Sequence, residues 1–147
     1  MKYQGNRDAG FFLGQQIGES IKNAELFQGI DYLVPIPLHP KKEHIRGYNQ
    51  SYVIAQGIED KTRIPIATDC LYRKVFTSTQ TKKSREERWD NVKEIFDINN
   101  HQKLIGKHIL LIDDVLTTGA TLLAAGKTLS QISDIKISAA TAACTAG

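Results

Sequence analysis

Residues 109–121 read ILLIDDVLTTGAT, and the fold class of this 147-residue chain follows from them. Four branched aliphatic residues, 109–112, predict a strand buried on both faces, as in the middle of a parallel sheet. Asp113 and Asp114 follow directly, and a turn of residues 115–121 leads into a helix. A strand, a turn and a helix in this order offer free backbone N–H groups and a positive dipole end to an anion, so we predict a phosphate site here.

The side chains of the turn and of the two acids indicate which chemical groups the ligand must have. Three threonine hydroxyls can donate hydrogen bonds to phosphate oxygens, and Gly119 allows the backbone to come close. Two adjacent carboxylates would repel a ligand that consisted of phosphate alone, but they can accept hydrogen bonds from the two hydroxyls of a sugar. The combination therefore predicts a phosphorylated ribose.

Two other protein classes share part of this pattern. A strand that ends in two acids also fits a Walker B strand or the acidic pair of a receiver domain. A Walker A loop needs four residues between its glycine and the Gly-Lys-Thr triplet, whereas six separate Gly119 from Gly126, and Gly126 falls inside a predicted helix. A receiver domain carries its acids after the first strand, and here they follow a late one.

The rest of the chain alternates between strand and helix patterns, which predicts one α/β domain, residues 1–147, with a mainly parallel central sheet flanked by helices. In the last helix, Leu122, Leu123, Ala125, Leu129 and Ile132 are predicted to point inward. A polar loop is expected at 37–46 and an exposed, mobile stretch at 77–90. The expected helices are 8–27, 49–60 and 119–130, and the expected strands are 31–36, 64–67, 71–76, 108–112 and 135–143.

The stretch 109–121 resembles the signature of type I phosphoribosyltransferases, which bind phosphoribosyl pyrophosphate (PRPP). The resemblance implies a three-layer fold of that type, with Asp113 and Asp114 as catalytic residues on the ribose hydroxyls. It also implies a turn that binds the 5'-phosphate, made of Leu116, Thr117, Thr118, Gly119, Ala120 and Thr121.

Other segments narrow the resemblance to the ComF/GntX group, whose members usually carry an amino-terminal zinc module that is not seen in this chain. These segments are Val-Pro-Ile-Pro at 34–37, Arg-Gly-Tyr-Asn-Gln at 46–50, Gln80 and residues 85–91. The resemblance implies a pyrophosphate loop that includes Leu38, His39, Lys41 and Arg46. It also implies a flexible closing loop with Lys82, Lys83, Arg85 and Arg88, and Mg²⁺ carried by PRPP, with Asp113 and Asp114 as its possible protein ligands.

We therefore expect a phosphoribosyltransferase that moves a phosphoribosyl group to an unidentified nitrogen acceptor and releases pyrophosphate. A non-catalytic PRPP or nucleotide sensor and a competence-associated accessory protein of DNA uptake stay open as alternatives, as does a homodimer. The net charge of +3 does not by itself support nucleic-acid binding. The chain has no apolar run of membrane-spanning length and no secretory signal pattern, so a cytoplasmic location is expected. Cys70 and Cys144 lack metal-ligand spacing and are expected to be reduced and structural.

Overall fold

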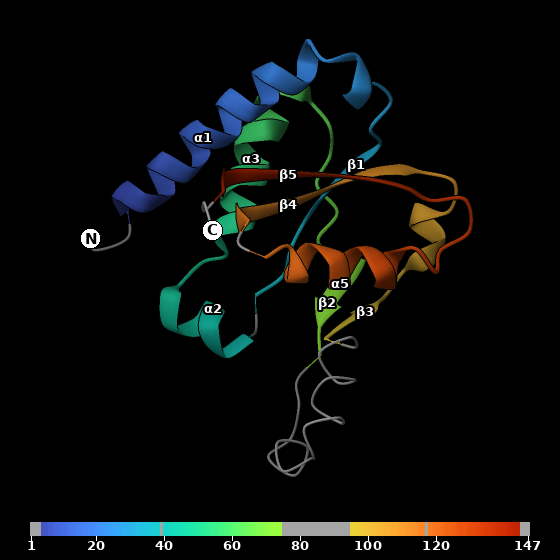
Figure 1. Cartoon of the computed structure of the whole chain (residues 1–147). Helices are drawn as coiled ribbons and strands as arrows, with labels where there is room; N and C mark the ends of the chain where they lie inside the picture. The colour runs from blue at the N-terminus through green and yellow to red at the C-terminus, as the bar shows by residue number, and fades with distance from the viewer. Residues whose placement is uncertain (1–3, 39, 75–94, 117, 145–147) are drawn as a thin grey trace.

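The computed structural model of the chain describes residues 4–38, 40–74, 95–116 and 118–144. Figure 1 shows three layers, with α1 and α3 on one face of a sheet and α5 on the other. In chain order the helices, 3-10 helices (η) and strands are α1 (Gln4–Lys22), η1 (Glu25–Phe27), β1 (Tyr32–Pro35), α2 (Pro40–Arg46), α3 (Gln50–Thr62), β2 (Leu71–Arg73), β3 (Phe96–Ile98), η3 (His101–Leu104), β4 (His108–Leu116), α5 (Ala120–Leu129) and β5 (Lys136–Cys144).

The main sheet has the order β1-β4-β5, and both of its strand pairs are parallel. The predicted parallel α/β fold, in which the strand that begins at His108 is central, is therefore confirmed. The predicted strand at 64–67 is reduced to a single parallel bridge between Leu33 and Ile66 on the outer side of β1. The short strands β2 and β3 form a separate antiparallel pair, which the sequence did not predict.

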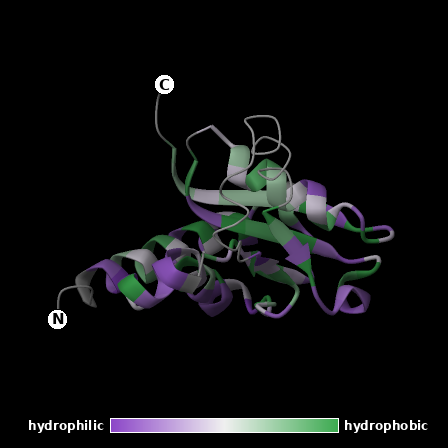
Figure 2. Cartoon of the chain, turned by 90° about the horizontal axis from the view of Figure 1, so that it is seen from below, coloured by the Kyte–Doolittle hydropathy of each residue, from purple (hydrophilic) through white to green (hydrophobic). Residues whose placement is uncertain are grey.

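Side chains of β4 alternate between two hydrophobic cores. Leu110 and Ile112 pack on the α1 and α3 side, whereas Ile109 and Leu111 pack on the α5 side. All four residues are at most 1% exposed, which confirms a strand buried on both faces. Figure 2 shows this as a hydrophobic layer between helices of mixed polarity. Because the faces alternate, Asp113 continues the α5 side of the strand and Asp114 the α1 side.

Helices α1 and α3 pack against each other more extensively than any other pair of elements. Glycines make this close approach possible, because a Cβ atom on Gly14 would overlap the carbonyl oxygen of Ile54, and one on Gly57 would overlap that of Phe11. Helix α1 is thereby held along the sheet, with its amino-terminal half next to the ends of β4 and β5 (Figure 1).

Several expectations were wrong in detail. Helix α2 occupies most of the predicted loop at 37–46. Strand β4 runs on to Leu116, so the two acids lie inside the strand rather than after it. In α5, Leu123 is 61% exposed instead of inward, although Ala125, Leu129 and Ile132 are buried as predicted. The predicted mobile stretch at 77–90 lies outside the described residues.

No helix among the described residues is long and apolar enough to cross a membrane. Neither cysteine is in a disulfide bond; Cys70 is buried, as expected of a structural residue, but Cys144 is exposed. Burial and a hydrogen bond to Cys70's neighbour Asp69 raise the pKa of the Cys70 thiol to about 11, so it is an inert core residue.

Candidate functional site

The site is built around the carboxyl end of β4, where Asp113 and Asp114 stand side by side. Each of these carboxylates accepts a hydrogen bond from the next backbone N–H: Asp114 N–H donates to Asp113 Oδ1 at 2.9 Å, and Val115 N–H donates to Asp114 Oδ1 at 2.9 Å. Both acids are partly buried. The pair is therefore held in place by local backbone bonds while its remaining oxygen lone pairs stay open to a ligand.

Asp113 is the acid whose protonation is most perturbed. Burial raises the pKa of Asp113 to about 6, and the Asp114 side chain contributes in the same direction through a hydrogen bond and charge repulsion, whereas the hydrogen bond from the Asp114 backbone N–H lowers it. The guanidinium of Arg73 opposes the shift. At neutral pH Asp113 is mostly ionised and can accept hydrogen bonds, but mild acid would remove that ability.

The raised pKa of Asp113 predicts a stability change that is separate from ligand binding. The proton stabilises the folded state fully below the ordinary pKa of 3.8, and this contribution is lost as pH rises through about 6. Asp113→Asn should therefore be more stable than the parent at pH 8, by about 1 kcal/mol once solvent screening of a half-exposed group is allowed for. The two proteins should have equal Tm values at pH 3.5. Thermal unfolding across this range measures the effect, and a gain that stays constant with pH would contradict it.

The predicted phosphate turn lies next to the acids, at the start of α5. Gly119 precedes the helix in the left-handed conformation (φ 81°), and Ala120 N–H donates to Thr118 Oγ1 at 3.3 Å. The first N–H groups of a helix have no acceptor within it, so those of Thr121 and Leu122 point at any ligand in front of the helix. A small hollow lies there, lined by Asp113, Val115, Leu116, Gly119, Ala120, Thr121 and Leu122.

This geometry leaves the phosphate prediction intact. The hollow holds about 10 Å³, room for little more than one water molecule, so a phosphate would sit at its mouth on the exposed turn. Thr118 and Ala120 are exposed there, and Gly119 and Thr121 are partly exposed. Thr117 lies outside the described residues, and the assignment of Leu116 to Thr121 to a 5'-phosphate stays a prediction.

The left-handed backbone at Gly119 predicts a position-specific cost. Gly119→Ala should lower the free energy of unfolding by about 1 kcal/mol, because a Cβ atom disfavours this conformation. The matched control is Gly126→Ala in the interior of α5, where no atom lies within 4 Å of the added Cβ. That change should instead add about 0.5–1 kcal/mol. Chemical denaturation measures both, and equal signs would contradict the assigned backbone.

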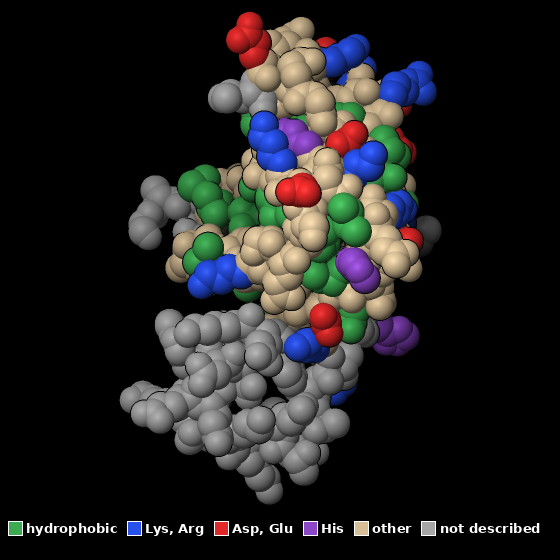
Figure 3. All heavy atoms as spheres, turned by 90° about the vertical axis from the view of Figure 1, so that its right-hand side faces the viewer, with side chains coloured by type: hydrophobic (Ala, Val, Ile, Leu, Met, Phe, Trp, Pro, Cys, Tyr) green, Lys and Arg blue, Asp and Glu red, His purple; other side chains and the backbone are tan. Residues whose placement is uncertain are grey.

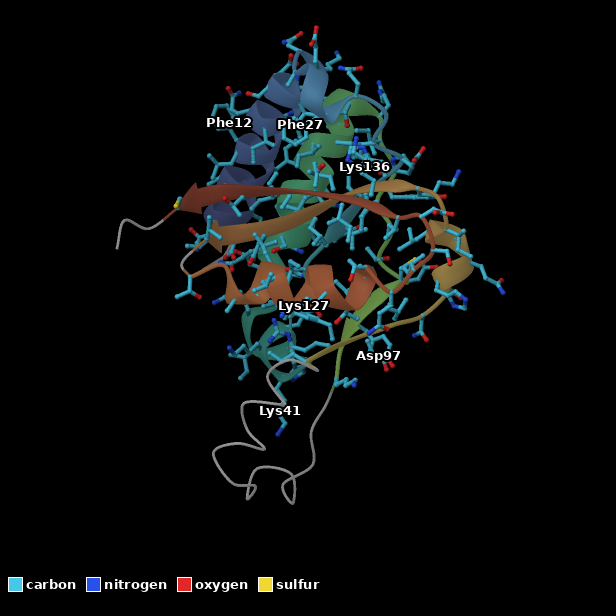
Figure 4. All side chains as sticks on the ribbon, turned by 45° about the vertical axis from the view of Figure 1, so that its right-hand side comes forward. Phe12, Phe27, Lys41, Asp97, Lys127 and Lys136 are labelled. Atoms are coloured by element: carbon cyan, nitrogen blue, oxygen red, sulfur yellow. The ribbon has the colours of Figure 1, made fainter. Side chains whose placement is uncertain are left out.

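The residues that are predicted to bind pyrophosphate follow β1, the strand that lies next to β4 in the sheet. Leu38 is half-buried just past the strand, and Lys41 projects from α2 (Figure 4). Arg46, expected in a polar loop, lies instead at the end of α2 and donates a hydrogen bond from Nη1 to Gln50 Oε1. His39 lies outside the described residues, as do Lys82, Lys83, Arg85 and Arg88.

Asn49 connects the chain after β1 to the start of α3, a role that was not predicted from the sequence. Its side-chain oxygen accepts from Ser51 N–H at 3.0 Å, which caps α3, and its Nδ2 donates to the Ile36 carbonyl at 3.1 Å. A cavity of about 260 Å³ opens beside Asn49 and Pro37, and Glu43 is its one charged lining residue among the described residues. The cavity alone is therefore not a pyrophosphate site, because an anion would need cations from elsewhere.

Arg73 is the second residue that the sequence analysis missed. At the end of β2, its Nε donates to the Pro37 carbonyl at 3.2 Å, and its guanidinium lies 4.9 Å from the centre of the Phe96 ring. Burial lowers the pKa of Arg73, and the charge of Asp113 opposes that shift. Arg73 thus connects the loop after β1 with the acidic pair, although Asp113 lies 40 residues further along the chain. No local sequence pattern could indicate this connection.

Replacing Arg73 should change the titration of Asp113. In Arg73→Met the pKa of the Asp113 carboxyl should rise above its parent value of about 6, because the nearby positive charge is gone. Carboxyl ¹³C shifts followed against pH measure this. The control is Lys74→Met, the next residue along the chain, which should leave the midpoint in place. An unshifted midpoint in Arg73→Met would show that the guanidinium does not act on the acid.

A family model described as the phosphoribosyl transferase domain matches residues 51–143, which include β4, both acids and the turn. The chain belongs to the phosphoribosyl transferase family. The competence protein ComFC of Bacillus subtilis (strain 168) is 37% identical over 99 residues, or 67% of this chain and 38% of that protein. Competence protein F of Haemophilus influenzae is 31% identical over 101 residues, or 68% of this chain and 44% of that protein.

These relatives confirm the predicted resemblance to the ComF group, although the match spans less than half of their length. The glutamine PRPP amidotransferase from B. subtilis aligns with a TM-score of 0.64 at 18% identity, over 92% of this chain and 26% of that chain. This likeness confirms the predicted type I phosphoribosyltransferase fold.

Proposed function

We propose that this phosphoribosyl transferase domain binds PRPP at the end of β4 and transfers its phosphoribosyl group to a nitrogen acceptor. The observation that carries the proposal is the position of two partly buried carboxylates directly beside an exposed turn at the amino end of α5. The carboxylates suit the ribose hydroxyls, and the N–H groups and hydroxyls of the turn suit the 5'-phosphate. With the family established, we also propose that the protein acts in the cytoplasm.

The described residues fit a magnesium ion that arrives with its substrate. No group of three or more His, Cys, Asp or Glu residues in the described ranges could hold a metal alone. Asp113 and Asp114 offer hard oxygen ligands that could complete the shell of an ion already bound to PRPP oxygens. When bound, Mg²⁺ would neutralise charge on the pyrophosphate.

The reaction that we propose needs little from the protein beyond binding and charge. The bond from C1 to the pyrophosphate oxygen breaks and its electron pair leaves with pyrophosphate. The lone pair of the acceptor nitrogen forms the new bond to C1, and the N–H proton passes to solvent. Asp113 and Asp114 offset the positive charge that develops on the ribose ring, and Arg73 holds the loop after β1 close to them.

Two measurements test the proposal. Calorimetry with PRPP and Mg²⁺ should show binding, and a pyrophosphate-release assay with a panel of nitrogen heterocycles should show turnover with at least one of them. Binding without release for any acceptor would favour the PRPP sensor over the transferase. Absence of PRPP binding would refute both.

The names of the relatives, which include a DNA utilization protein as well as competence proteins, favour one other function, that of a DNA-handling competence protein. The face at which β4 and β5 begin carries interspersed basic and acidic side chains in its described part, and no basic patch (Figure 3). DNA binding through the backbone phosphates should weaken steeply with added salt and be unchanged in Asp113→Asn, whereas PRPP binding should be much weaker in that variant. A filter-binding series in 50–300 mM salt separates the two functions.

A further inference from the structure

Strand β5 forms an open edge of the main sheet. In the order β1-β4-β5 it is bonded to β4 on one side, and no strand among the described residues pairs with its other side. Figure 1 shows α1 above β5 and α5 below it, so these helices flank the two faces of the sheet and its edge lies between them. A strand in this position presents a row of backbone N–H and C=O groups to a further strand.

The hydrogen bonds of β5 identify the backbone groups that point outward. Lys136 N–H donates to the carbonyl oxygen of Lys107 at 2.9 Å, at the start of the pairing with β4. The backbone groups of successive residues in a strand point to opposite sides, so every second residue from Lys136 onward also bonds to β4. The N–H and C=O groups of the residues between them point to the open edge. These residues are Ile137, Ala139, Thr141 and Ala143.

The sequence of β5 does not protect this edge against strand addition. The strand is nine residues long, it contains no proline, and its one charged side chain is that of Lys136 at its first position. Its register with β4 keeps a single offset from Lys136 to Cys144, so β5 has no bulge. Natural edge strands are usually kept apart by shortness, charge, proline or a bulge. The edge is therefore suited to pairing with another strand.

The outward groups of β5 are complementary to those of a second copy of β5. We consider two copies that run antiparallel about a two-fold axis at Ala140. Each outward-pointing residue then lies opposite an outward-pointing residue of the other copy, so every outward N–H and C=O of the strand has a partner. The resulting residue pairs are Ile137 with Ala143, and Ala139 with Thr141.

The side chains of β5 also permit this approach. On the axis the two Ala140 residues face each other as a pair without mutual hydrogen bonds, in which the Cα atoms are about 4.5 Å apart, and a methyl side chain fits that distance. On the α5 side of the sheet Ala143 is exposed and Ile137 is half-buried, so their contact would cover apolar surface. Each Lys136 lies opposite residue 144 of the other copy, so no like charges face each other.

We propose that β5 is a homodimer interface, at which two copies of this chain pair antiparallel into one continuous sheet. The interface is isologous, because the same strand serves both copies. The complementarity of β5 with itself and the lack of charge from 137 to 143 favour a second copy over a strand of another protein. The inference does not rest on PRPP binding, and its test needs no substrate.

Sedimentation equilibrium of the full chain at increasing concentrations tests the dimer. The weight-average mass should rise from 16.4 kDa toward twice that value. Ala139→Pro removes an outward N–H that does not bond to β4, so the variant should fold, as circular dichroism can check, and dimerise about tenfold more weakly or less. Ala139→Ser keeps the N–H and is the matched control, which should dimerise like the parent.

Disulfide cross-linking tests the register. In a Cys144→Ser background, Ala140→Cys should form a covalent dimer on mild oxidation, because a Cα separation of about 4.5 Å allows a disulfide bond. Ala142→Cys, on the same face of the strand, is the control. In the proposed register residue 142 lies opposite residue 138 of the other copy and too far from its own counterpart. Cys70 is buried and stays in place in both variants.

The possible results either support or overturn the interface. A monomer at every concentration, parent-like dimerisation of folded Ala139→Pro, or equal cross-linking of the two cysteine variants would overturn it. A monomeric chain that binds an extended peptide along β5 would also overturn it and would assign the edge to another protein. If Ala139→Pro fails to fold, the mass of the parent and the two cysteine variants decide the question.

Discussion

Calorimetric titration of Asp113→Asn with PRPP and Mg²⁺ is expected to show binding about 10- to 150-fold weaker than that of the parent protein at pH 7.5. The amide cannot offer two charged acceptor oxygens to the ribose hydroxyls, and hydrogen bonds to charged groups contribute about 1.5–3 kcal/mol. Asp114→Asn should cause a loss of the same order. Because the pKa of Asp113 is about 6, PRPP affinity of the parent should also fall between pH 7 and pH 5.

The control for this experiment is Asp60→Asn at the far end of α3, where the carboxylate accepts a hydrogen bond from Gln15 at 3.0 Å. It removes the same charge without touching the strand ends, so PRPP affinity should stay within twofold of the parent. Parent-like affinity in both Asp113→Asn and Asp114→Asn would remove the acidic pair from the PRPP site. A loss of PRPP affinity at pH 5 that persists unchanged in Asp113→Asn would assign the pH dependence to another group.

Gly14→Ala is expected to destabilise the fold by about 3 kcal/mol, which corresponds to a fall in Tm of roughly 6–12 °C for a domain of this size. The added Cβ would overlap the carbonyl oxygen of Ile54 and lie 3.0 Å from the Cα atom of Gly57, so α1 must move away from α3. Backbone atoms cannot rotate aside as a side chain can. Thermal unfolding measures the change.

Gly10→Ala on the same helix provides a graded comparison, because its Cβ would lie 3.3 Å from a side-chain atom, Val53 Cγ1, which can adjust. Its effect should be below 1 kcal/mol. Equal Tm values for the two variants would show that the glycine contact does not hold the helices together.

Local sequence patterns predicted the elements whose structure depends on residues that are neighbours in the chain. The buried strand before Asp113 and the helix after Gly119 were predicted because a continuous aliphatic run and a glycine turn are properties of neighbouring residues. Periodicity failed for Leu123, which is an apolar residue on an exposed helix face. It also failed at 40–46, where α2 has a polar sequence that lacks any apolar stripe.

The segment 109–121 by itself carries the strand, both acids and the turn of the proposed ribose and phosphate site, since these parts are contiguous and their relative geometry is local. The partners of that site come from distant parts of the chain. Arg73 lies near the acids from β2, Asn49 connects α3 to the end of β1, and α1 lies beside the ends of β4 and β5. Such neighbours arise when strands pair and helices cover a sheet, and the free energy of burying the core, rather than any pattern in the chain, brings them together.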